Sequence, residues 1–304
     1  MSEFRDSADY RCGFVAVVGR PNVGKSTLIN HLVGHKVSIV SPRPQTTRHR
    51  ILGVQTSDDA QIVFIDTPGI HVGQRKAINR VMNRAAISAL AEADVIVWLI
   101  EAGQWTALDD NVLQRLSECR QPVIAVINKV DLVRDKKTLL PFLQSVHARR
   151  DFHSVVPISA LRGDQTDVLR ETVAALMPLS PAMFPDAMHT DRSDTFRYAE
   201  IVREKLTLRL HQELPYGLTV QTERVVDEDD RLVIHCIIFV ERDSQKGIVV
   251  GKGGQALKAV GSAARRDLNA LTGRRVHLEL WVKVKDNWAD NEQDLQRLGF
   301  DFDH

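Results

Sequence analysis

The sequence predicts an α/β domain with a mostly parallel, doubly wound sheet, followed by a smaller α+β domain. Nearly all-apolar runs of strand length recur in the first 180 residues, namely GFVAVVG, AQIVFID, DVIVWLIEA, QPVIAVIN and SVVPISA. Such runs are typical of strands that are covered on both faces. Longer amphipathic stretches separate them, for example at 75–92 and 108–119. This alternation of strands and helices indicates a doubly wound sheet.

A different order of elements follows the proline-rich stretch LMPLSPAMFPDAMHTD. We expect a helix at 195–213, the strands LTVQTERVVD and LVIHCIIFVER, a glycine-rich loop, a helix at about 253–272 and a last strand, RVHLELWVKVK. This order predicts an α+β domain. The expected boundaries are an N-terminal extension at 1–11, the first domain at 12–178, a linker at 179–194, the second domain at 195–285 and an acidic tail at 286–304.

The composition is that of an ordinary soluble globular protein, with 43% hydrophobic and 26% charged residues. The cysteines, Cys12, Cys119 and Cys236, have no metal-binding spacing and indicate a reducing compartment. The apolar runs are too short to span a bilayer, and the first eleven residues lack the apolar stretch of a signal peptide. We therefore expect a cytoplasmic protein.

Charge is distributed unevenly, although the formal net charge is only +1. Residues 242–285 contain ten Lys or Arg against three Asp or Glu, whereas 286–304 contain six acids and one Arg. A basic stretch of this kind favours a nucleic-acid partner. We expect the acidic tail to be solvated and frayed. The alternative is that the tail covers the basic surface when the nucleic acid is absent.

A phosphate-binding loop is predicted near the start of the chain, where Gly19-x-x-x-x-Gly24-Lys25-Ser26 separates a strand from a helix. Backbone N–H groups of such a P-loop surround a phosphate, and the helix N-terminus adds a favourable dipole. Lys25 is expected to reach the β- and γ-phosphates, and Ser26 to ligate Mg2+. The predicted nucleotide contacts here are Gly19, Arg20, Pro21, Asn22, Val23, Gly24, Lys25, Ser26 and Thr27.

Further motifs follow in order and select guanine: DTPG at 66–69, NKVD at 128–131 and ISA at 158–160. Asp66 is placed to hold magnesium through water, and the Gly69 N–H to contact a γ-phosphate. Asp131 can accept hydrogen bonds from guanine N1–H and the exocyclic amine, which adenine does not offer in that arrangement. Asn128 is expected to brace the loop, and the Ala160 N–H to donate to guanine O6. The remaining predicted contacts are Thr67, Pro68, Ile70, Lys129, Ser159 and Leu161.

These motifs together resemble the translation-factor-related class of P-loop GTPases over residues 12–178. The resemblance identifies PQTTRHRI at 44–51 as switch I, the loop that responds to the γ-phosphate. It implies that a switch I threonine joins Ser26 and Asp66 as a magnesium ligand. We expect this threonine to be Thr47, because in similar GTPases the ligand directly precedes an Arg; Thr46 is the alternative.

The residue after DTPG departs from the Ras-like pattern, in which a Gln orients the attacking water. This chain has Ile70 there, so we expect slow intrinsic hydrolysis without a side-chain base. Lys25, Thr47 and Gly69 are the expected transition-state and water-positioning groups. Asn22 has two interpretations: an Asn at this position accompanies a potassium ion in some similar GTPases, and an Asn beside a proline is also a turn former.

A second glycine-rich loop, GKGG at 251–254, differs from a P-loop because its glycines are closer together and no Ser or Thr follows the lysine. It fits the G-x-x-G clamp of a type II KH domain, which holds the backbone of about four nucleotides. The alternative is a tight turn between helices in a purely structural domain. The expected RNA contacts are Lys246, Ile248, Val250, Gly251, Lys252, Gly253, Gly254 and Lys258.

The two domains, with QTTRHRI, DTPGI, NKVD and the closing segment LWVKVKDNWADNEQDLQRLGF, resemble the Era family of bacterial GTPases over nearly the whole chain. The resemblance implies binding of GTP and GDP with Mg2+, and GTP hydrolysis coupled to assembly of the small ribosomal subunit. It also implies that the KH domain holds small-subunit ribosomal RNA near its 3′ end, and that the protein contacts the inner membrane peripherally. We expect a monomer.

Two other functions fit parts of the pattern. A small-molecule phosphotransferase could use the same P-loop, although NKVD argues against it. A GTPase could also use its KH domain to dock a protein rather than RNA. Trp281 and Trp288 could both stack on bases, but core packing is the expectation for Trp281.

Overall fold

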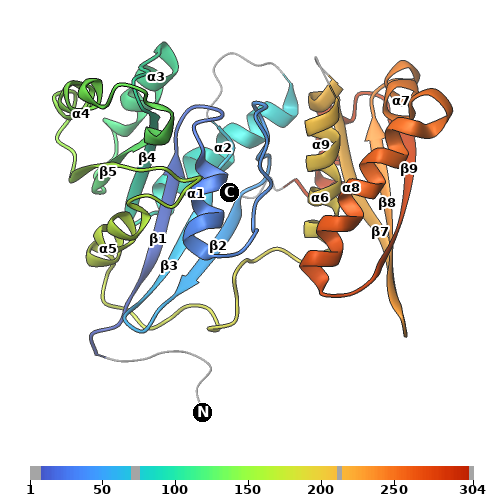
Figure 1. Ribbon diagram of the computed structural model, residues 1–304, viewed down its shortest axis with the longest axis horizontal. Coiled ribbons are helices and arrows are strands. Elements are labelled where there is room, and N and C mark those ends of the chain that lie inside the picture. The colour runs from blue at the N-terminus through green and yellow to red at the C-terminus, as the bar shows by residue number, and fades with distance from the viewer. Residues whose placement is uncertain (1–7, 70–75, 211–213, 301–304) are drawn as a thin grey trace.

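The computed structural model describes residues 8–69, 76–210 and 214–300. These residues form two domains that lie side by side, and the connecting segment runs along the lower edge of the first domain before it enters the second (Figure 1). None of the helices in the described residues is long and apolar enough to cross a membrane.

The first domain is a six-stranded sheet with helices on both faces. Its strand order is β2-β3-β1-β4-β5-β6, and every neighbouring pair is parallel except β2 with β3. The elements are β1 (Arg11–Val18), α1 (Lys25–Val33), β2 (Ile51–Thr56), β3 (Ala60–Asp66), α2 (Ala77–Glu92), β4 (Val95–Glu101), α3 (Ala107–Leu116), β5 (Val123–Asn128), α4 (Leu139–His147), β6 (Ser154–Pro157) and α5 (Thr166–Leu176). The predicted fold class is confirmed, and β2 is a strand that the apolar runs did not reveal.

Hydrophobic layers on both faces explain why these strands are apolar throughout. Val15 and Val17 of β1 face a core shared with α1 and α5, whereas Ala16 and Val18 face a core shared with α2, α3 and α4. The loops that carry the nucleotide motifs leave the carboxyl ends of β1, β3, β5 and β6. In open α/β sheets this edge is where ligands bind.

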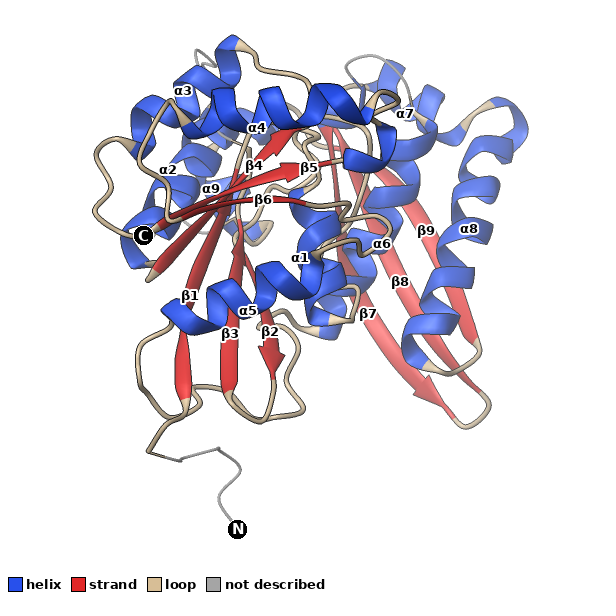
Figure 2. Ribbon diagram, turned by 60° about the vertical axis from the view of Figure 1, so that its left-hand side comes forward, coloured by secondary structure: helices blue, strands red, loops and turns tan. Residues whose placement is uncertain are grey.

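The second domain has the element order of a type II KH fold. Its elements are α6 (Asp194–Arg209), β7 (Leu218–Glu228), β8 (Arg231–Val240), α7 (Asp243–Val250), α8 (Gln255–Thr272) and β9 (Val276–Val284). Strand β8 is central, antiparallel to β7 and parallel to β9. Helices α6 and α8 share one hydrophobic core with the sheet and cover one of its faces, as Figure 2 shows.

One helix prediction in this domain needs correction. Helix α6 ends at Arg209 rather than at 213, because Leu210 adopts an extended backbone; residues 211–213 lie outside the described residues. The stretch GIVV before the second glycine-rich loop is the last turn of α7. Short 3-10 turns complete the structure at Val130–Leu132, Lys136–Thr138, Leu214–Gly217, Lys252–Gly254 and Trp288–Asp290.

The connecting segment covers the free edge of β2. The backbone of Val54 donates to His189 O at 3.0 Å, and the Leu52 N–H donates to Asp191 Oδ1 at 2.9 Å. Covering an edge strand removes exposed backbone donors that would otherwise pair with another chain. The segment therefore has a packing role as well as a connecting one.

The expectation of a frayed acidic tail is wrong for residues 286–300. These residues form the 3-10 turn Trp288–Asp290 and helix α9 (Glu292–Arg297), which pack against α2 of the first domain. Trp288 is completely buried in a small core with Ala77, Ile78 and Val81. The apolar residues within the acidic segment decide this outcome, because their burial outweighs the tendency of a chain end to fray.

Candidate nucleotide site and RNA groove

Asn128 ties together the loops of the nucleotide site. Its amide Nδ2 donates to the carbonyl of Val23 in the P-loop at 2.8 Å, and its Oδ1 accepts from the Ala160 N–H at 2.9 Å. Gly24 lies beside it with φ +105°, and a Cβ there would come within 2.3 Å of Asn128 Nδ2. The loop therefore needs glycine at 24 for its backbone conformation and for this close approach.

Lys25, the first residue of α1, lies buried beneath the P-loop. Its Nζ donates to the carbonyls of Gly19 at 3.1 Å and Arg20 at 3.2 Å. Burial lowers the pKa of Lys25 to about 8, while the charge of Asp66 opposes that shift. A desolvated cation held in this way is a strong partner for phosphate oxygens.

Three oxygen-bearing side chains meet beside the P-loop. The Ser26 hydroxyl lies 2.9 Å from both Thr47 Oγ1 and Asp66 Oδ2, and Thr47 Oγ1 lies 3.3 Å from the same carboxylate oxygen. Hydroxyl and carboxylate oxygens are the ligands that Mg2+ prefers. Asp66 Oδ1 is buried without a hydrogen-bond partner in the described residues, so this donor set fits the expected ion.

Switch I turns its two threonines in different directions. Thr46 Oγ1 lies 2.6 Å from Ser41 Oγ and donates to Arg43 O at 2.7 Å, away from the P-loop. Thr47 is buried and faces Ser26. This geometry favours Thr47 over Thr46 as the metal ligand.

Burial raises the pKa of Asp66, against the opposing effects of Lys25 and of the hydroxyl groups around it. A buried carboxylate of this kind gains most from a cation.

The residues predicted to contact guanine lie at the ends of β5 and β6. Asp131 Oδ1 accepts a hydrogen bond from the Ser159 hydroxyl at 2.7 Å, which orients the carboxylate. Lys129 has φ +65°, and its Nζ lies 3.0 Å from Glu101 Oε2. Leu161 is 78% exposed beside this site.

Glu101 is a site residue that the sequence interpretation missed. Its carboxylate lies 2.8 Å from Arg20 Nη2 in the P-loop as well as 3.0 Å from Lys129 Nζ. It therefore links the phosphate loop to the NKVD loop. Its position at the carboxyl end of β4, the edge where the motifs meet, is the signal that could have identified it.

The remaining predicted nucleotide contacts differ in where they point. Pro21, Gly24, Thr27 and Gly69 line a pocket with Lys25, Ser26 and switch I. The Thr67 hydroxyl instead donates to Val17 O at 3.1 Å, which is a structural contact with β1. Asn22 has φ +63° and donates from its side chain to Pro42 O at 2.8 Å. Ile70 lies outside the described residues, and Pro68 is buried.

The G-x-x-G loop joins α7 to α8 through a 3-10 turn at Lys252–Gly254. Gly251 has φ +73°, and a Cβ there would lie 2.6 Å from that of Ala256, so the turn requires glycine. Val249 is buried in the domain core, whereas Ile248 is 59% exposed and Val250 is half-buried. Ile248 and Val250 therefore remain available beside the loop.

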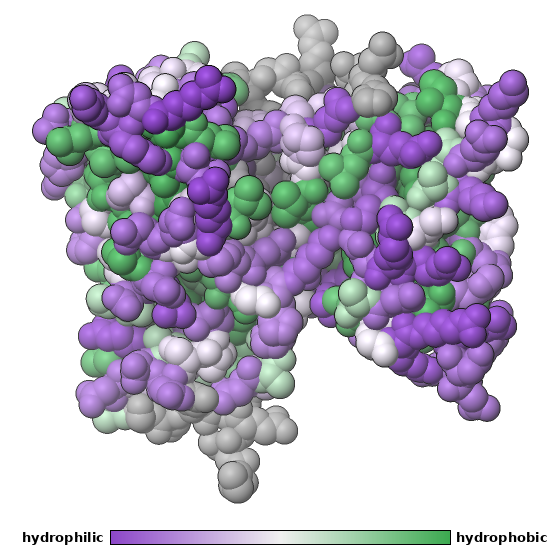
Figure 3. Space-filling view, viewed as in Figure 1, coloured by the Kyte–Doolittle hydropathy of each residue, from purple (hydrophilic) through white to green (hydrophobic). Residues whose placement is uncertain are grey.

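A groove extends from this loop between α8 and the free edge of β9. It is lined by Gly254, Leu257, Lys258, Gly261, Ser262, Arg265, Leu278 and Leu280. Strongly hydrophilic side chains gather over this part of the molecule in Figure 3. Of the predicted RNA contacts, Gly254 and Lys258 lie in the groove; the other lining residues were missed. Of these, Leu257, Gly261, Ser262 and Arg265 recur at a spacing of three or four along α8, which is a signal that was present in the sequence.

The burial of the two tryptophans near the chain end differs from the expectation. Trp281 is 43% exposed on the sheet face that the helices leave open, where it stacks on His235 with ring centroids 5.4 Å apart. Trp288 is the one in a core, and its Nε1 donates to Gly217 O at 3.2 Å. The expectation of core packing for Trp281 is therefore wrong.

Comparison with known proteins identifies both domains. A family model described as 50S ribosome-binding GTPase matches residues 14–129, and a KH domain model matches residues 213–289. GTPase Era of Coxiella burnetii is 50% identical over 290 residues, which cover 95% of this chain and 98% of that relative. The chain belongs to the GTPase Era family. The resemblance inferred from the motifs is confirmed.

Other members of the Era family are similar to this chain along nearly its whole length. GTPase Era of Vibrio parahaemolyticus is 47% identical over 98% of this chain and 94% of its own length. A variant of Aquifex aeolicus Era bound to GDP.AlF4- has a TM-score of 0.92 and 40% identity, covering 96% of this chain and all of that one. Era in complex with MgGDPNP and nucleotides 1506-1542 of 16S ribosomal RNA has a TM-score of 0.93 at the same identity and coverage.

Proposed function

We propose that this chain is a GTP-hydrolysing switch that binds small-subunit ribosomal RNA near its 3′ end and acts in small-subunit assembly. The observation that carries this proposal is the pairing of two sites in one chain. Ser26, Thr47 and Asp66 converge beside a P-loop, and a basic groove opens from a G-x-x-G turn. A solved relative, Era with MgGDPNP and nucleotides 1506-1542 of 16S ribosomal RNA, supports it.

In this proposal the P-loop residues 19–27 bind the phosphates, with Lys25 as the main cation. Ser26, Thr47 and Asp66 would hold Mg2+, which when bound supplies positive charge to the phosphate oxygens. Asp131, oriented by Ser159, would read guanine, and the Ala160 N–H would donate to the base. DTPG and the loops at 128–131 and 158–161 complete the proposed nucleotide contacts.

Hydrolysis would proceed without a side-chain base, because no Gln follows DTPG. The Gly69 N–H and Thr47 would position the water and the γ-phosphate, so we expect a low intrinsic rate. We further propose that Asn22 supports a monovalent cation. Its side chain already links the P-loop to Pro42, just before switch I, and a potassium ion near Asn22 would add positive charge there. Equal turnover in potassium and sodium would leave Asn22 as a turn former only.

The RNA site of this proposal consists of Lys246, Ile248, Val250, Gly251, Lys252, Gly253, Gly254 and Lys258. Replacing Lys252 and Gly253 with Asp tests it, because two carboxylates at the clamp would repel the nucleic-acid backbone. RNA binding should be lost while GTP turnover is retained. Unchanged RNA binding would favour the alternative, a KH domain that docks a protein. On the family resemblance we also propose a cytoplasmic monomer with peripheral contact at the inner membrane.

A further inference from the structure

We propose that Arg203 of the KH domain is a positioning residue for the magnesium–GTP site of the first domain. It would act through the backbone of switch I, by holding the carbonyl of Thr46 so that the hydroxyl of Thr47 stays beside Ser26 and Asp66. This inference rests on the proposed function, because it concerns the regulation of the same site. It makes the KH domain part of the GTPase machinery as well as an RNA-binding module.

Arg203 lies on α6 and is itself held rigidly. Its side chain is only 2% exposed, and both Nε and Nη2 donate to the Glu200 carboxylate at 2.6 Å. The same Nη2 also donates to Thr46 O. Burial would raise the pKa of Glu200, but the Arg203 charge and hydrogen bonds hold it below its ordinary value, so the pair is ionised. A bidentate guanidinium has a fixed plane, which a lysine would not reproduce.

Arg48 secures the other side of Thr47. Its guanidinium donates to the carbonyls of Leu218 and Pro215, each at 2.7 Å, in the segment that leads into β7. Burial first, and then the nearby Arg203 charge, lower the pKa of Arg48 to about 9, which leaves it charged at neutral pH. The residues on both sides of Thr47 therefore contact the KH domain, while Thr47 itself faces the P-loop.

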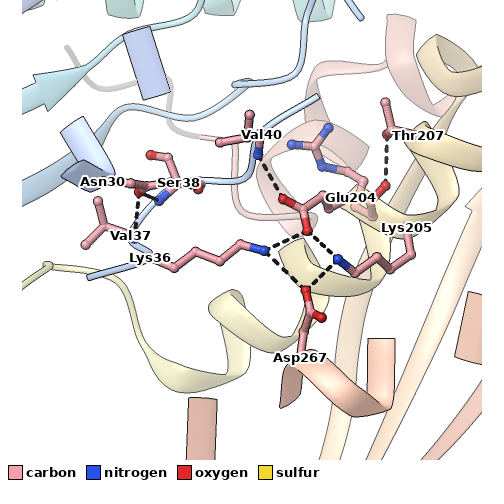
Figure 4. A network of polar contacts seen from close by, with 10 residues as sticks. Asn30, Lys36, Val37, Ser38, Val40, Glu204, Lys205, Thr207 and Asp267 are labelled. Carbon is pink, nitrogen blue, oxygen red and sulfur yellow. Dashed lines mark hydrogen bonds and ion pairs between the residues drawn. The ribbon is translucent and has the colours of Figure 1, made fainter. Parts of the chain in front are cut away.

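The segment before switch I is anchored to the same helix. Lys36 and Lys205 both contact the carboxylates of Glu204 and Asp267, at distances from 2.5 to 3.4 Å, and the Val40 N–H donates to Glu204 Oε1 at 2.9 Å (Figure 4). Lys36 and Asp267 are about one-third exposed, so solvent weakens these ion pairs. The Arg203 side chain is buried and its contact with Thr46 is adjacent to Thr47, which is why we assign the positioning role to Arg203.

The contact between Arg203 and switch I should favour binding of GTP but not of GDP. A switch I threonine serves the metal only while a γ-phosphate is present, so a contact that holds Thr47 in place favours the GTP state. Coupling of this kind is reciprocal: magnesium and GTP should in turn favour the observed contact between the domains. The KH domain would thus sense the nucleotide through a backbone carbonyl.

Binding of a non-hydrolysable GTP analogue at varied Mg2+ tests the proposal in the full-length chain. Arg203→Ala should raise the Mg2+ concentration needed for half-maximal analogue binding about tenfold, as expected for a lost hydrogen bond to a charged group. GDP affinity should stay unchanged. In the Thr47→Ala background, Arg203→Ala should add no further loss, because the route through Thr47 is already broken.

Controls separate positioning from folding. Arg209→Ala removes an exposed arginine from the end of the same helix and should leave the Mg2+ dependence unchanged. If Arg203→Ala melts below the assay temperature, Arg203→Lys is compared with the wild type instead. An ammonium group keeps the positive charge but lacks the planar, bidentate geometry of the guanidinium. An unchanged Mg2+ requirement in the folded variant, or additive losses with Thr47→Ala, would overturn the inference. A wild-type chain that showed neither GTP turnover nor Mg2+-dependent analogue binding would overturn the proposed function instead.

Discussion

Asp290 and Ala77 connect the end of the chain to the helix that follows the DTPG loop: Asp290 Oδ1 accepts a hydrogen bond from the Ala77 N–H at 2.9 Å. Ala77 is the first residue of α2, whose N-cap residue, Lys76, makes no capping hydrogen bond with its side chain. A residue more than two hundred positions away in the sequence therefore satisfies a free donor of this helix. The acidic segment thereby contributes to the structure of the nucleotide domain.

Removal of this cap should destabilise the protein modestly. Asp290→Ala loses a hydrogen bond and a favourable charge at a helix N-terminus, for which we expect a decrease in the free energy of unfolding of about 0.5–1 kcal/mol. Urea unfolding followed by circular dichroism measures the change. Asp286→Ala removes an exposed acid from the same segment and is the matched control. Equal stability of the two variants would contradict the capping role.

A change at Asp131 should alter base preference. Asp131→Asn replaces an acceptor of the guanine N1–H and amine, so GTP affinity should fall by at least a hundredfold. Xanthosine triphosphate should bind the variant better than GTP does. Xanthine O2 can accept a hydrogen bond from the new asparagine amide, whereas guanine has a donor amine at that position. Competition between the two nucleotides measures this preference. Retained guanine preference would show that Asp131 does not read the base.

The lowered pKa of Lys25 predicts a pH dependence of nucleotide binding. The charged form binds phosphate, and in the free protein this form is lost as pH rises through about 8. GTP affinity should therefore fall above pH 8, and binding near pH 8.5 should take up a proton. Calorimetry in buffers of different ionisation enthalpy counts that proton. Lys25→Ala should bind weakly with no proton uptake; equal uptake in that variant would assign the proton to another group.

A larger side chain at Gly261 should obstruct the groove beside the G-x-x-G loop. The position lies on α8, and only Leu280 lies near a Cβ placed there, at 3.5 Å, so a larger side chain would extend into the groove. Gly261→Leu should weaken RNA binding at least tenfold and leave GTP turnover unchanged. Ala270→Leu places the same side chain at an exposed position near the end of α8 and is the control. RNA affinity is measured at fixed salt.

The sequence by itself determined the fold class and the nucleotide and KH loops. These features are carried by contiguous residues, in which glycines and polar groups at fixed spacings shape a backbone loop between predicted elements. The P-loop, NKVD and GKGG could be read for this reason without any distant contact.

The tertiary structure alone decided how distant segments meet. Alternation along β9 shows that Trp281 and its neighbours face opposite sides of the sheet, but only the packing of α6 and α8 decides which side is buried. The burial of Trp288, the cap from Asp290 and the hold of Arg203 on Thr46 all join residues far apart in the chain. Such contacts depend on the geometry of two folded domains, which no local pattern of residues encodes.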